Sequence, residues 1–553
     1  ICSISKNNEN VPIAVLSDKN DIIIAEMNDS NIFEEQKIEN SDTAIWSLCA
    51  GMGDYSFVTV FSDGLYGLKE NQWLKICDFT ENDFSSYNIF DMIMTAENEF
   101  AVVIKTDDNK FEMRLLTERD ISEIKEKKII KMAITLSSGS DIDDKTVKKF
   151  NSENDVYKIE LVNYGNTGET PAEWAENLKK DIITGNSPDI VTFNSDMSID
   201  TFGAKESIFV DFYSLLDNDN DFSRTDFIDG FLEGMESNGK LLMIDSGFTL
   251  KTLCIKNKFT NSFSQWNYEQ FLEVYNNMPD DMILGADISY STRTDVFMDL
   301  INYNSFIDYD NASCNFKSDN FIKAMKLISE NEIGLTNAQA DAMWDSPPMI
   351  YTEQAELYRT DKALISKCKI NSFFSIKETM QGYFNEPATF IGYPSEAENG
   401  TFRTVNGGYS IMANSDNIEG AWEFLKYYLF SETDNTRSEF SGLEKNFIAQ
   451  LEYEKTEHLE KDPETGEMMN MDGYWLGGDF NNIIDIEPLT DAEADKYDKF
   501  VRISVKNTIK PNNEVDKIIK EELDSYFNGE RSAEETAGII QNRVSIYISE
   551  CYT

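Results

Sequence analysis

The stretch "KIIKMAITLSSGSDIDDKTVKKFNSENDVYKIELVNYG", residues 128–165, decides the fold of the larger part of this chain. Its opening run, 128–136, is apolar and typical of a buried strand, and a small polar loop follows at 137–143. Residues 144–154 have the apolar spacing of a helix, and 157–165 again favour a strand. Strand, loop, helix and strand in this order predict an α/β fold with a mainly parallel, doubly wound sheet.

The same alternation continues towards the C-terminus. Residues 171–185 predict a helix with Pro171 near its start and Gly185 at its end, and 188–193 predict a third strand. In such sheets ligands lie beyond the carboxyl ends of the strands, so 137–140 and 194–196 are the candidate loops.

The closing part of the chain predicts two amphipathic helices separated by Asn528 and Gly529. Ser532 with Glu535 three residues later forms a capping box, which marks the start of the second helix.

A weak repeat occupies the first 120 residues. Three segments share an apolar strand, an Asp turn and a second strand, and the turns at Asp18, Asp63 and Asp107 are 45 and 44 residues apart. This period is the size of a propeller blade, so we expect an all-β, partial propeller-like segment over 1–125, followed by a second domain over 126–553. A plain antiparallel sheet with similar hairpins is the alternative.

The composition excludes some classes of function. With 100 acidic residues, 49 basic residues and a net charge of -51, the chain lacks the clustered Lys and Arg that nucleic acid needs. Seven cysteines without a CxxC motif give neither a zinc site nor a disulfide framework. Cys2 is a candidate for the lipid-modified cysteine of a bacterial lipoprotein, and the alternative is an ordinary residue near a chain end.

Enzyme motifs are largely missing. The single histidine, His458, is expected to be exposed in a polar helix, so a Ser-His-Asp triad or a multi-histidine metal site is not predicted. The acidic loop at 217–228 lacks the Gly and Glu that a calcium loop requires. We therefore expect no enzyme activity, no metal and no cofactor, although a pair of carboxylates acting on a glycosidic bond stays open.

Six segments in a fixed order carry a resemblance to a known family. They are 128–165, 183–193, 237–253, 388–402, 405–432 and 527–550. In this order they resemble the extracellular solute-binding proteins (family 1-like) of ABC sugar importers, over about three quarters of the chain. The resemblance implies a two-lobed periplasmic-binding-protein-like clamshell whose α/β lobes are joined by crossing strands. It also implies a monomeric, extracellular or membrane-anchored protein that delivers its ligand to an ABC permease.

The resemblance also implies ligand contacts at particular positions: Ser137, Ser138, Gly139, Asn194, Ser195, Phe248, Thr249, Trp344, Gly407, Gly408 and Tyr409. The segment "SGFTLKT" would cross between the lobes, and the two glycines would let backbone approach a ligand on which Tyr409 stacks or to which it donates. A glycine turn required only for packing is the alternative there, as a core-capping role is for Trp344.

The sequence departs from that family in its β-repeat segment and in the long acidic stretch 460–480. The favoured hypothesis is a protein that captures a neutral mono- or oligosaccharide. The alternatives are an extracellular carbohydrate-active enzyme with an acidic cleft, and an adhesion or sensing protein that uses the β-repeat segment.

Overall fold

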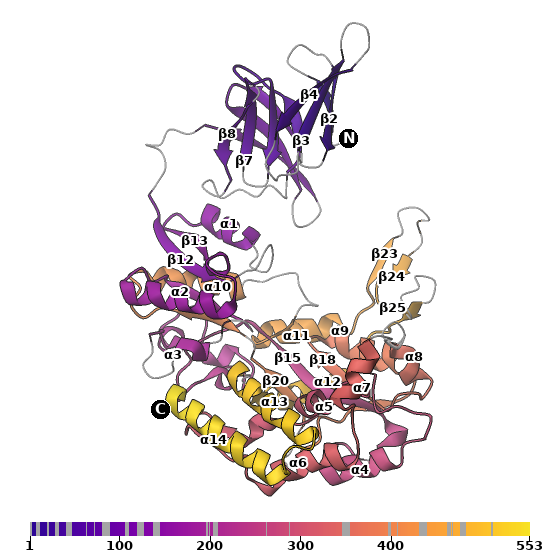
Figure 1. Cartoon of the computed structure of the whole chain (residues 1–553). Coiled ribbons are helices and arrows are strands. Elements are labelled where there is room, and N and C mark those ends of the chain that lie inside the picture. Colours follow the sequence, from indigo (N-terminus) through magenta and orange to yellow (C-terminus); the bar gives the residue numbers. More distant parts are fainter. Residues whose placement is uncertain are drawn as a thin grey trace. The chain divides into compact units, whose positions relative to one another are not determined.

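The computed structural model describes most of the 553 residues. The described residues are 3–6, 12–18, 21–27, 33–39, 47–61, 64–70, 72–79, 89–105, 110–118, 126–135, 144–194, 197, 199–202, 208–260, 263–286, 288–344, 354–395, 400–405, 407–430, 439–461, 466, 468–475, 483–509 and 512–552. The chain forms two compact units, Ile1–Ile130 with Ser138–Glu160, and Lys131–Ser137 with Leu161–Thr553 (Figure 1).

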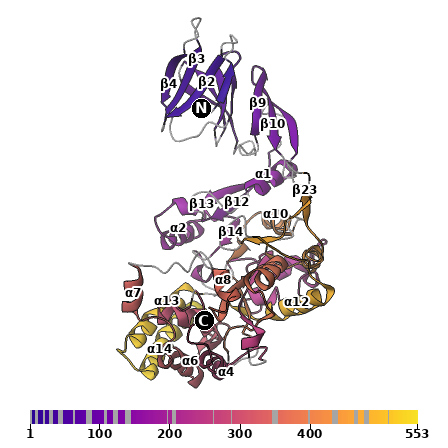
Figure 2. The ribbon, with the colours of Figure 1, turned by 90° about the vertical axis from the view of Figure 1, so that its right-hand side faces the viewer.

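The first unit contains three antiparallel sheets whose strands follow one another in chain order, β1-β2-β3-β4, β5-β6-β7-β8 and β9-β10-β11 (Figure 2). Their bounds are β1 (Ser3–Lys6), β2 (Pro12–Asp18), β3 (Asp21–Met27), β4 (Phe33–Glu39), β5 (Ser47–Ala50), β6 (Phe57–Phe61), β7 (Gly64–Lys69), β8 (Gln72–Asp78), β9 (Ile89–Ala96), β10 (Glu99–Lys105) and β11 (Phe111–Thr117). Helix α1 (Asp144–Glu153) also belongs to this unit.

The propeller predicted from the repeat is not shown. The described strands of the first unit form three separate sheets, and none of these closes on itself. Asp18 does lie at a hairpin turn, where it pairs with Asp21, whereas Asp63 and Asp107 lie outside the described residues. An Asp turn between two apolar strands specifies a hairpin, but a ring depends on how several sheets pack together, which the repeat does not encode.

The third sheet of the first unit has apolar side chains on both faces. Phe100, Val102 and Ile104 of β10 alternate into a core shared with the second sheet, as the period of two in a strand requires. On the opposite face Met113 is 77 % exposed, and Ile93 is 56 % exposed. This face therefore contributes little to the stability of the unit.

The second unit has mixed α/β content and two main sheets. The first sheet has the order β13-β12-β14-β21, in which β12 runs parallel to β14 and β14 antiparallel to β21. The second has the order β18-β15-β20-β27, and β19 and β22 also pair with β15. The bounds are β12 (Lys128–Ile134), β13 (Tyr157–Asn163), β14 (Ile190–Phe193), β15 (Gly247–Lys256), β16 (Ile307–Asp308), β17 (Ser313–Cys314), β18 (Ile365–Ile370), β19 (Ala388–Phe390), β20 (Phe402–Thr404), β21 (Gly408–Ile411), β22 (Phe440–Ser441) and β27 (Thr508–Ile509). The boundary between the units falls within β12 and β13.

The helices of the second unit begin and end at recognisable signals. Thr170 and Glu173 form a capping box at the start of α2, Pro171 is its first residue, and Gly185 ends it with φ +85°, which confirms the predicted helix. The helices are α2 (Pro171–Thr184), α3 (Phe212–Leu216), α4 (Tyr268–Asn276), α5 (Arg293–Leu300), α6 (Asp319–Glu330), α7 (Asn337–Trp344), α8 (Gln354–Arg359), α9 (Phe373–Lys377), α10 (Ile418–Phe430), α11 (Glu444–Tyr453), α12 (Asp491–Ser504), α13 (Asn513–Phe527) and α14 (Ala533–Tyr552), with a π-helix at Glu378–Tyr383. Short 3-10 turns lie at Tyr164–Asn166, Ile199–Phe202, Arg224–Asp226, Glu233–Met235, Asn257–Phe259 and Tyr303–Phe306.

Each main sheet of the second unit has its own core. Val191 and Phe193 of β14 pack with Trp174 of α2 beneath the first sheet. The core of the second sheet is larger and includes buried side chains of α4, α5, α6, α13 and α14. The predicted tail helices are confirmed, and the Ser532 hydroxyl and Glu535 form the expected capping contacts at the start of α14.

The acidic stretch near residue 470 forms two small hairpins. They consist of β23 (Leu459–Lys461) with β24 (Met468–Asn470), and β25 (Gly473–Trp475) with β26 (Ile483–Asp485). We call residues 459–485 the hairpin extension.

Candidate functional site

Three segments of the chain lie side by side where it passes between the two main sheets of the second unit. Ile244, just before β15, exchanges two backbone hydrogen bonds with Tyr409 of β21, at 2.9 and 3.0 Å. Further along, Thr249 pairs with Thr404 of β20. Phe440 of β22 pairs with Phe248 from the other side. We call residues 244–249, 403–409 and 439–441 the crossing segments.

Asp245 is the central acidic group of the crossing segments. Its Oδ1 accepts a hydrogen bond of 2.7 Å from the backbone N–H of Ser246. Burial raises the pKa of this carboxyl to about 6, and the negative charge of Glu439 acts in the same direction, whereas Arg403 lowers it.

Arg403 places a cation inside the crossing segments. Its side chain is buried, with an exposed fraction of 1 %, and its guanidinium lies 4.3 Å from the ring centre of Phe231 and 5.8 Å from that of Phe248. Its Nη1 donates to the Phe231 carbonyl oxygen at 2.8 Å, and its Nε has no hydrogen-bond partner among the described residues. Burial lowers the pKa of Arg403 to about 10, while the charge of Asp245 opposes this effect.

Tyr409 follows the two glycines, Gly407 and Gly408, that the sequence analysis grouped with it. Its ring lies edge-on to that of Tyr428, at 5.6 Å between centres. Burial raises the pKa of Tyr409 well above its usual value, and the neighbouring Tyr428 and Asp245 add to this effect. The hydroxyl therefore stays protonated at neutral pH and can donate a hydrogen bond.

The two glycines before Tyr409 are required by packing. A Cβ atom on Gly407 would lie 2.2 Å from the carbonyl oxygen of Phe193, and one on Gly408 would lie 2.8 Å from that of Ile244. Gly408 also has φ +154°, which side-chain-bearing residues rarely adopt. These contacts support the packing alternative for both positions.

Phe248 and Thr249 lie beneath the surface of the crossing segments. Phe248 is 2 % exposed and stacks on Phe440 at 5.3 Å between ring centres. Thr249 is 3 % exposed and its hydroxyl donates to Glu439 Oε1 at 3.0 Å. In this arrangement both side chains position the crossing segments and the Glu439 carboxylate.

The remaining predicted ligand residues are described only in part. Asn194 follows β14, and its side-chain amide donates to the Thr135 hydroxyl at 3.0 Å, so it lies beyond the carboxyl ends of β12 and β14 as predicted. Trp344 is the last residue of α7, and its side chain is outside the described part. The other predicted residues, Ser137, Ser138, Gly139 and Ser195, also lie outside the described residues.

A pocket of about 420 Å³ lies elsewhere in the second unit. Its walls include Tyr275, Arg293, Glu332 and Gln339, and it is not lined by those predicted ligand residues whose side chains the structure describes.

Several residues of the crossing segments were missed by sequence reasoning. Asp245 lies one residue before the segment "SGFTLKT" that was expected to cross, so its position was a usable signal. Arg403 and Glu439 gave no comparable signal, because their proximity to Asp245 depends on pairing between distant strands.

His458 differs from the prediction. It lies between α11 and β23 rather than in a helix, and its side chain is 11 % exposed rather than solvated. Its ring stacks on Tyr453 at 3.9 Å between centres, and Nδ1 lies 2.9 Å from Asp472 Oδ2. The polar composition around residue 458 concealed a buried contact with a residue of the hairpin extension.

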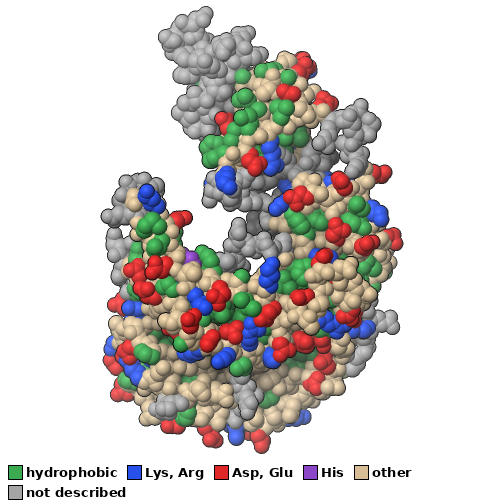
Figure 3. Space-filling view, turned by 180° about the vertical axis from the view of Figure 1, so that it is seen from behind, with side chains coloured by type: hydrophobic (Ala, Val, Ile, Leu, Met, Phe, Trp, Pro, Cys, Tyr) green, Lys and Arg blue, Asp and Glu red, His purple; other side chains and the backbone are tan. Residues whose placement is uncertain are grey.

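The crossing segments combine aromatic surfaces with acceptors and donors of hydrogen bonds. Asp245 and Glu439 accept, Tyr409 and its neighbour Tyr428 of α10 can do both, and Arg403 supplies a buried positive charge. The members that are at least partly exposed, Asp245, Glu439 and the Tyr409 ring, suit a ligand with an apolar face and a rim of hydroxyl groups. On the face of the second unit shown in Figure 3, acidic and basic side chains are interspersed.

No protein-family model matches the chain, and no curated protein matches its sequence. Three of the solved structures to which the chain is similar are the following. A periplasmic oligogalacturonide binding protein from Yersinia enterocolitica is 12% identical with a TM-score of 0.50, over 77% of this chain and 100% of that chain. The sugar-binding protein MalE from Xanthomonas citri is 9% identical with a TM-score of 0.46, over 76% and 98%. An ABC substrate-binding protein from Listeria monocytogenes, in complex with cycloalternan, is 11% identical with a TM-score of 0.44, over 77% and 100%.

At this identity the likeness to the Yersinia enterocolitica protein shows the fold alone. The chain is therefore similar to periplasmic binding proteins of mixed α/β content, which is consistent with a two-lobed fold. None of the helices in the described part is long and apolar enough to cross a membrane.

Proposed function

We propose that this protein captures a neutral carbohydrate, a mono- or oligosaccharide, and delivers it to an ABC permease without changing it chemically. The observation that carries the proposal is the set of crossing segments, in which Ile244 and Tyr409 join two chain connections between the main sheets. Two α/β sheets connected in this way can rotate as lobes about a short hinge and close on a ligand.

The chemistry of the crossing segments supports a neutral ligand. Asp245 and Glu439 present two carboxylates, and the cation that acts on Asp245, Arg403, is enclosed by Phe231 and Phe248. An anionic ligand would meet repulsion from the carboxylates, whereas sugar hydroxyls can donate to them.

The proposal assigns binding to 126–553 and takes 1–125 as a separate β module. Ligand contacts come from Ser137, Ser138, Gly139, Asn194, Ser195, Trp344 and the Gly407, Gly408 and Tyr409 patch, while Phe248 and Thr249 hold the crossing strand in place. The protein acts as a monomer at the cell surface or outside the cell, with Cys2 as the candidate position for a lipid anchor.

Thermal unfolding of the full chain in the presence of neutral oligosaccharides, uronates, phosphorylated sugars and peptides tests the proposal. A neutral sugar at 100 times its dissociation constant should stabilise the protein by about 2.7 kcal/mol. Tyr409→Phe, which removes the hydroxyl, should weaken binding by about 2- to 10-fold, the value of one hydrogen bond. Tyr526→Phe, a half-buried tyrosine of α13, is the matched control. Absence of any stabilisation by sugars would contradict the proposal.

One observation favours a second candidate, a carbohydrate-active enzyme. Asp245 has a pKa raised to about 6 and is influenced by a second carboxylate, Glu439, which is the pattern of a glycosidase acid and its partner. Chromatography of the bound sugar after prolonged incubation separates the candidates, because a binding protein returns its ligand unchanged. Breakdown that disappears in Asp245→Asn would establish the enzyme.

A further inference from the structure

Four charged or titratable side chains meet at one buried point outside the crossing segments. Lys377, the last residue of α9, places Nζ 2.7 Å from Glu454 Oε2 and 2.9 Å from Asp472 Oδ2. Asp472 lies between the two hairpins of the extension, and His458 Nδ1 lies 2.9 Å from the same Oδ2. We call these four residues the Lys377 cluster.

The cluster is shielded from water. The side chains of Lys377, Glu454 and Asp472 are 0%, 1% and 3% exposed. The Phe374 ring lies 5.6 Å from Nζ, and the Tyr453 ring covers His458. An amine and two carboxyl groups are therefore held in contact where few waters compete for them.

A metal ion does not account for this arrangement. Ligand atoms of Glu454, His458 and Asp472 lie within 4.8 Å of one another, as a metal site would require. The Lys377 ammonium, however, already contacts both carboxylates, so an ion would have to displace a buried positive charge.

A second buried lysine of the chain differs from Lys377 in the exposure of its carboxylate partners. Lys256 is also buried, at 2%, and contacts Asp361 at 2.7 Å and Glu386 at 3.8 Å. Those carboxylates are 37% and 42% exposed, so water solvates them and the contact is an ordinary ion pair. In the Lys377 cluster both carboxylate partners, Glu454 and Asp472, are buried away from water.

We propose that the Lys377 amine and the Asp472 carboxyl group condense to an intramolecular isopeptide bond, with Glu454 as the catalytic residue. A new bond joins Nζ to Cγ of Asp472, and the bond from Cγ to Oδ2 breaks. The ammonium loses two protons and the carboxylate loses one oxygen, which leave together as one water molecule, so the step needs no oxidant or other reactant.

The neighbouring groups can move the protons that this step requires. Glu454 Oε2, in contact with Nζ, accepts a proton from the ammonium and so frees the amine lone pair. Each ring nitrogen of His458 faces an acceptor. Nδ1 faces Asp472 Oδ2, and Nε2 lies 3.1 Å from the Tyr453 carbonyl oxygen, so an imidazolium at this position can donate to both. A proton from His458 Nδ1 on Asp472 Oδ2 turns this oxygen into a leaving group. Glu454 takes two protons from Nζ in turn. It gives one to the departing oxygen, which completes the water molecule, and the other to His458, which restores its starting form.

The bond would tie the hairpin extension to α9 across 95 residues of sequence. Lys377 immediately precedes the π-helix Glu378–Tyr383, whose Gly382 packs against Tyr474 of β25. The linkage therefore fixes one hairpin of the extension on the body of the second unit.

Intact mass spectrometry of the purified full chain tests the proposal directly. The expected mass is one water below that of the sequence, and proteolysis should yield a branched peptide joining the segments around Lys377 and Asp472. Lys377→Arg keeps the charge but removes the amine, and Glu454→Gln keeps the shape but removes the base. Both variants should have the full mass of their sequences.

Lys256→Arg is the matched control and should retain the loss of one water. A wild-type chain with its full sequence mass after prolonged incubation would overturn the proposal. So would a loss of water that persists in Lys377→Arg, or one that maps to another pair of residues. If Lys377→Arg does not fold, the wild-type mass and the branched peptide still decide the question.

Discussion

Ile244 and Tyr409 are joined by both of their backbone amides, with Tyr409 N–H donating to Ile244 O at 2.9 Å and Ile244 N–H donating to Tyr409 O at 3.0 Å. This pair lies at the point where two connections pass between the main sheets. Any change that separates the two residues should loosen both connections together.

Gly407→Ala should destabilise the protein by about 1–3 kcal/mol or more, because its Cβ would meet the Phe193 carbonyl oxygen at 2.2 Å and backbone would have to move. Gly538→Ala is the matched control. Gly538 lies inside α14, where an added Cβ would lie 3.8 Å from the end of the Lys317 side chain, in ordinary contact, so alanine should be neutral or stabilise by up to about 1 kcal/mol. Urea unfolding of both variants measures the difference, and equal effects would contradict the packing role.

Asp245→Asn should stabilise the protein at neutral pH. The folded-state pKa of about 6 lies above the usual value, so folding favours the protonated carboxyl, and this stability is lost as the pH rises through about 6. The cost of the charged form at pH 7.5 is at most about 3 kcal/mol. The free energy of unfolding should therefore fall between pH 5 and pH 7.5 by less in Asp245→Asn than in the wild type. An unchanged pH profile would remove Asp245 as the source of this dependence.

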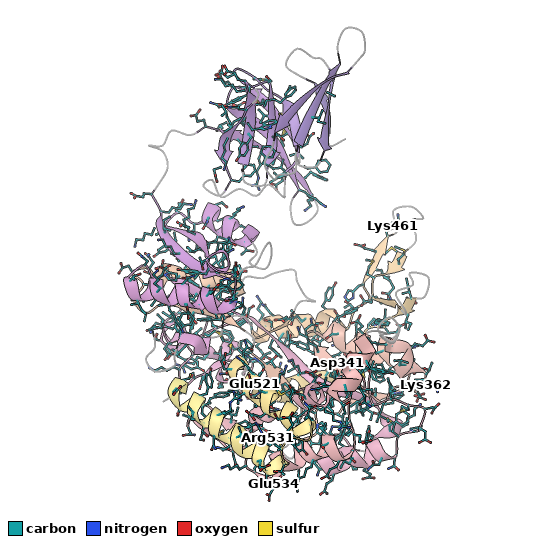
Figure 4. The ribbon with its side chains drawn as sticks, in the orientation of Figure 1. Asp341, Lys362, Lys461, Glu521, Arg531 and Glu534 are labelled. Carbon is teal, nitrogen blue, oxygen red and sulfur yellow. The ribbon has the colours of Figure 1, made fainter. Side chains whose placement is uncertain are left out.

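Ion pairs of the second unit should contribute more to the free energy of unfolding where they are buried than where they are exposed. Glu522 of α13 is 8 % exposed and accepts hydrogen bonds from Arg531 and, at 2.6 Å, from Arg543 of α14, while Glu521 binds the second arm of Arg543. Glu521 and Arg531 are labelled in Figure 4. Glu522→Ala leaves two cations without their shared partner and should cost about 1–3 kcal/mol.

Lys362→Ala serves as the comparison, because its pair with Asp281 is exposed at both ends, 49% and 73%, and should be worth less than about 1 kcal/mol. Raising the salt concentration should reduce the effect of the second change more than that of the first. A larger loss in Lys362→Ala than in Glu522→Ala would contradict this ranking.

The two faces of the third sheet in the first unit should respond differently to substitution. Ile104→Ala removes a side chain that is 5 % exposed and should cost about 2–5 kcal/mol. Met113→Thr, on the face where that residue is 77 % exposed, should change the stability by no more than about 0.5 kcal/mol. Thermal unfolding of the two variants checks this contrast, and a large loss in Met113→Thr would mean that the face is covered.

Local signals in the sequence were sufficient for the elements of the second unit. Pro171, Gly185, Ser532 and Glu535 act within a few residues of where they lie, so the bounds of α2 and α14 could be read from them. The crossing of "SGFTLKT" into β15 followed from an ordered set of segments. In contrast, the contact of Thr249 with Glu439 spans 190 residues, and no local pattern carries such information.

The same distinction explains why the propeller is not shown and why the position of His458 was predicted wrongly. The 45-residue repeat specified hairpins, which are local, but not the packing of sheets into a ring. His458 stands among polar neighbours in sequence, yet Asp472 contacts its ring nitrogen and the Tyr453 ring of α11 covers it.

The pairing of β15 has a consequence for synthesis of the chain. This strand, Gly247–Lys256, finds its partners in β18, β19, β20 and β22, and none of them is made before the ribosome has passed residue 365. Apolar side chains of β15 therefore stay exposed to solvent while more than a hundred further residues are synthesised; they include Leu250, Leu253 and Ile255. Since non-local pairing is slow and exposes apolar strands to wrong partners, we expect the nascent chain to depend on chaperones until β22 arrives.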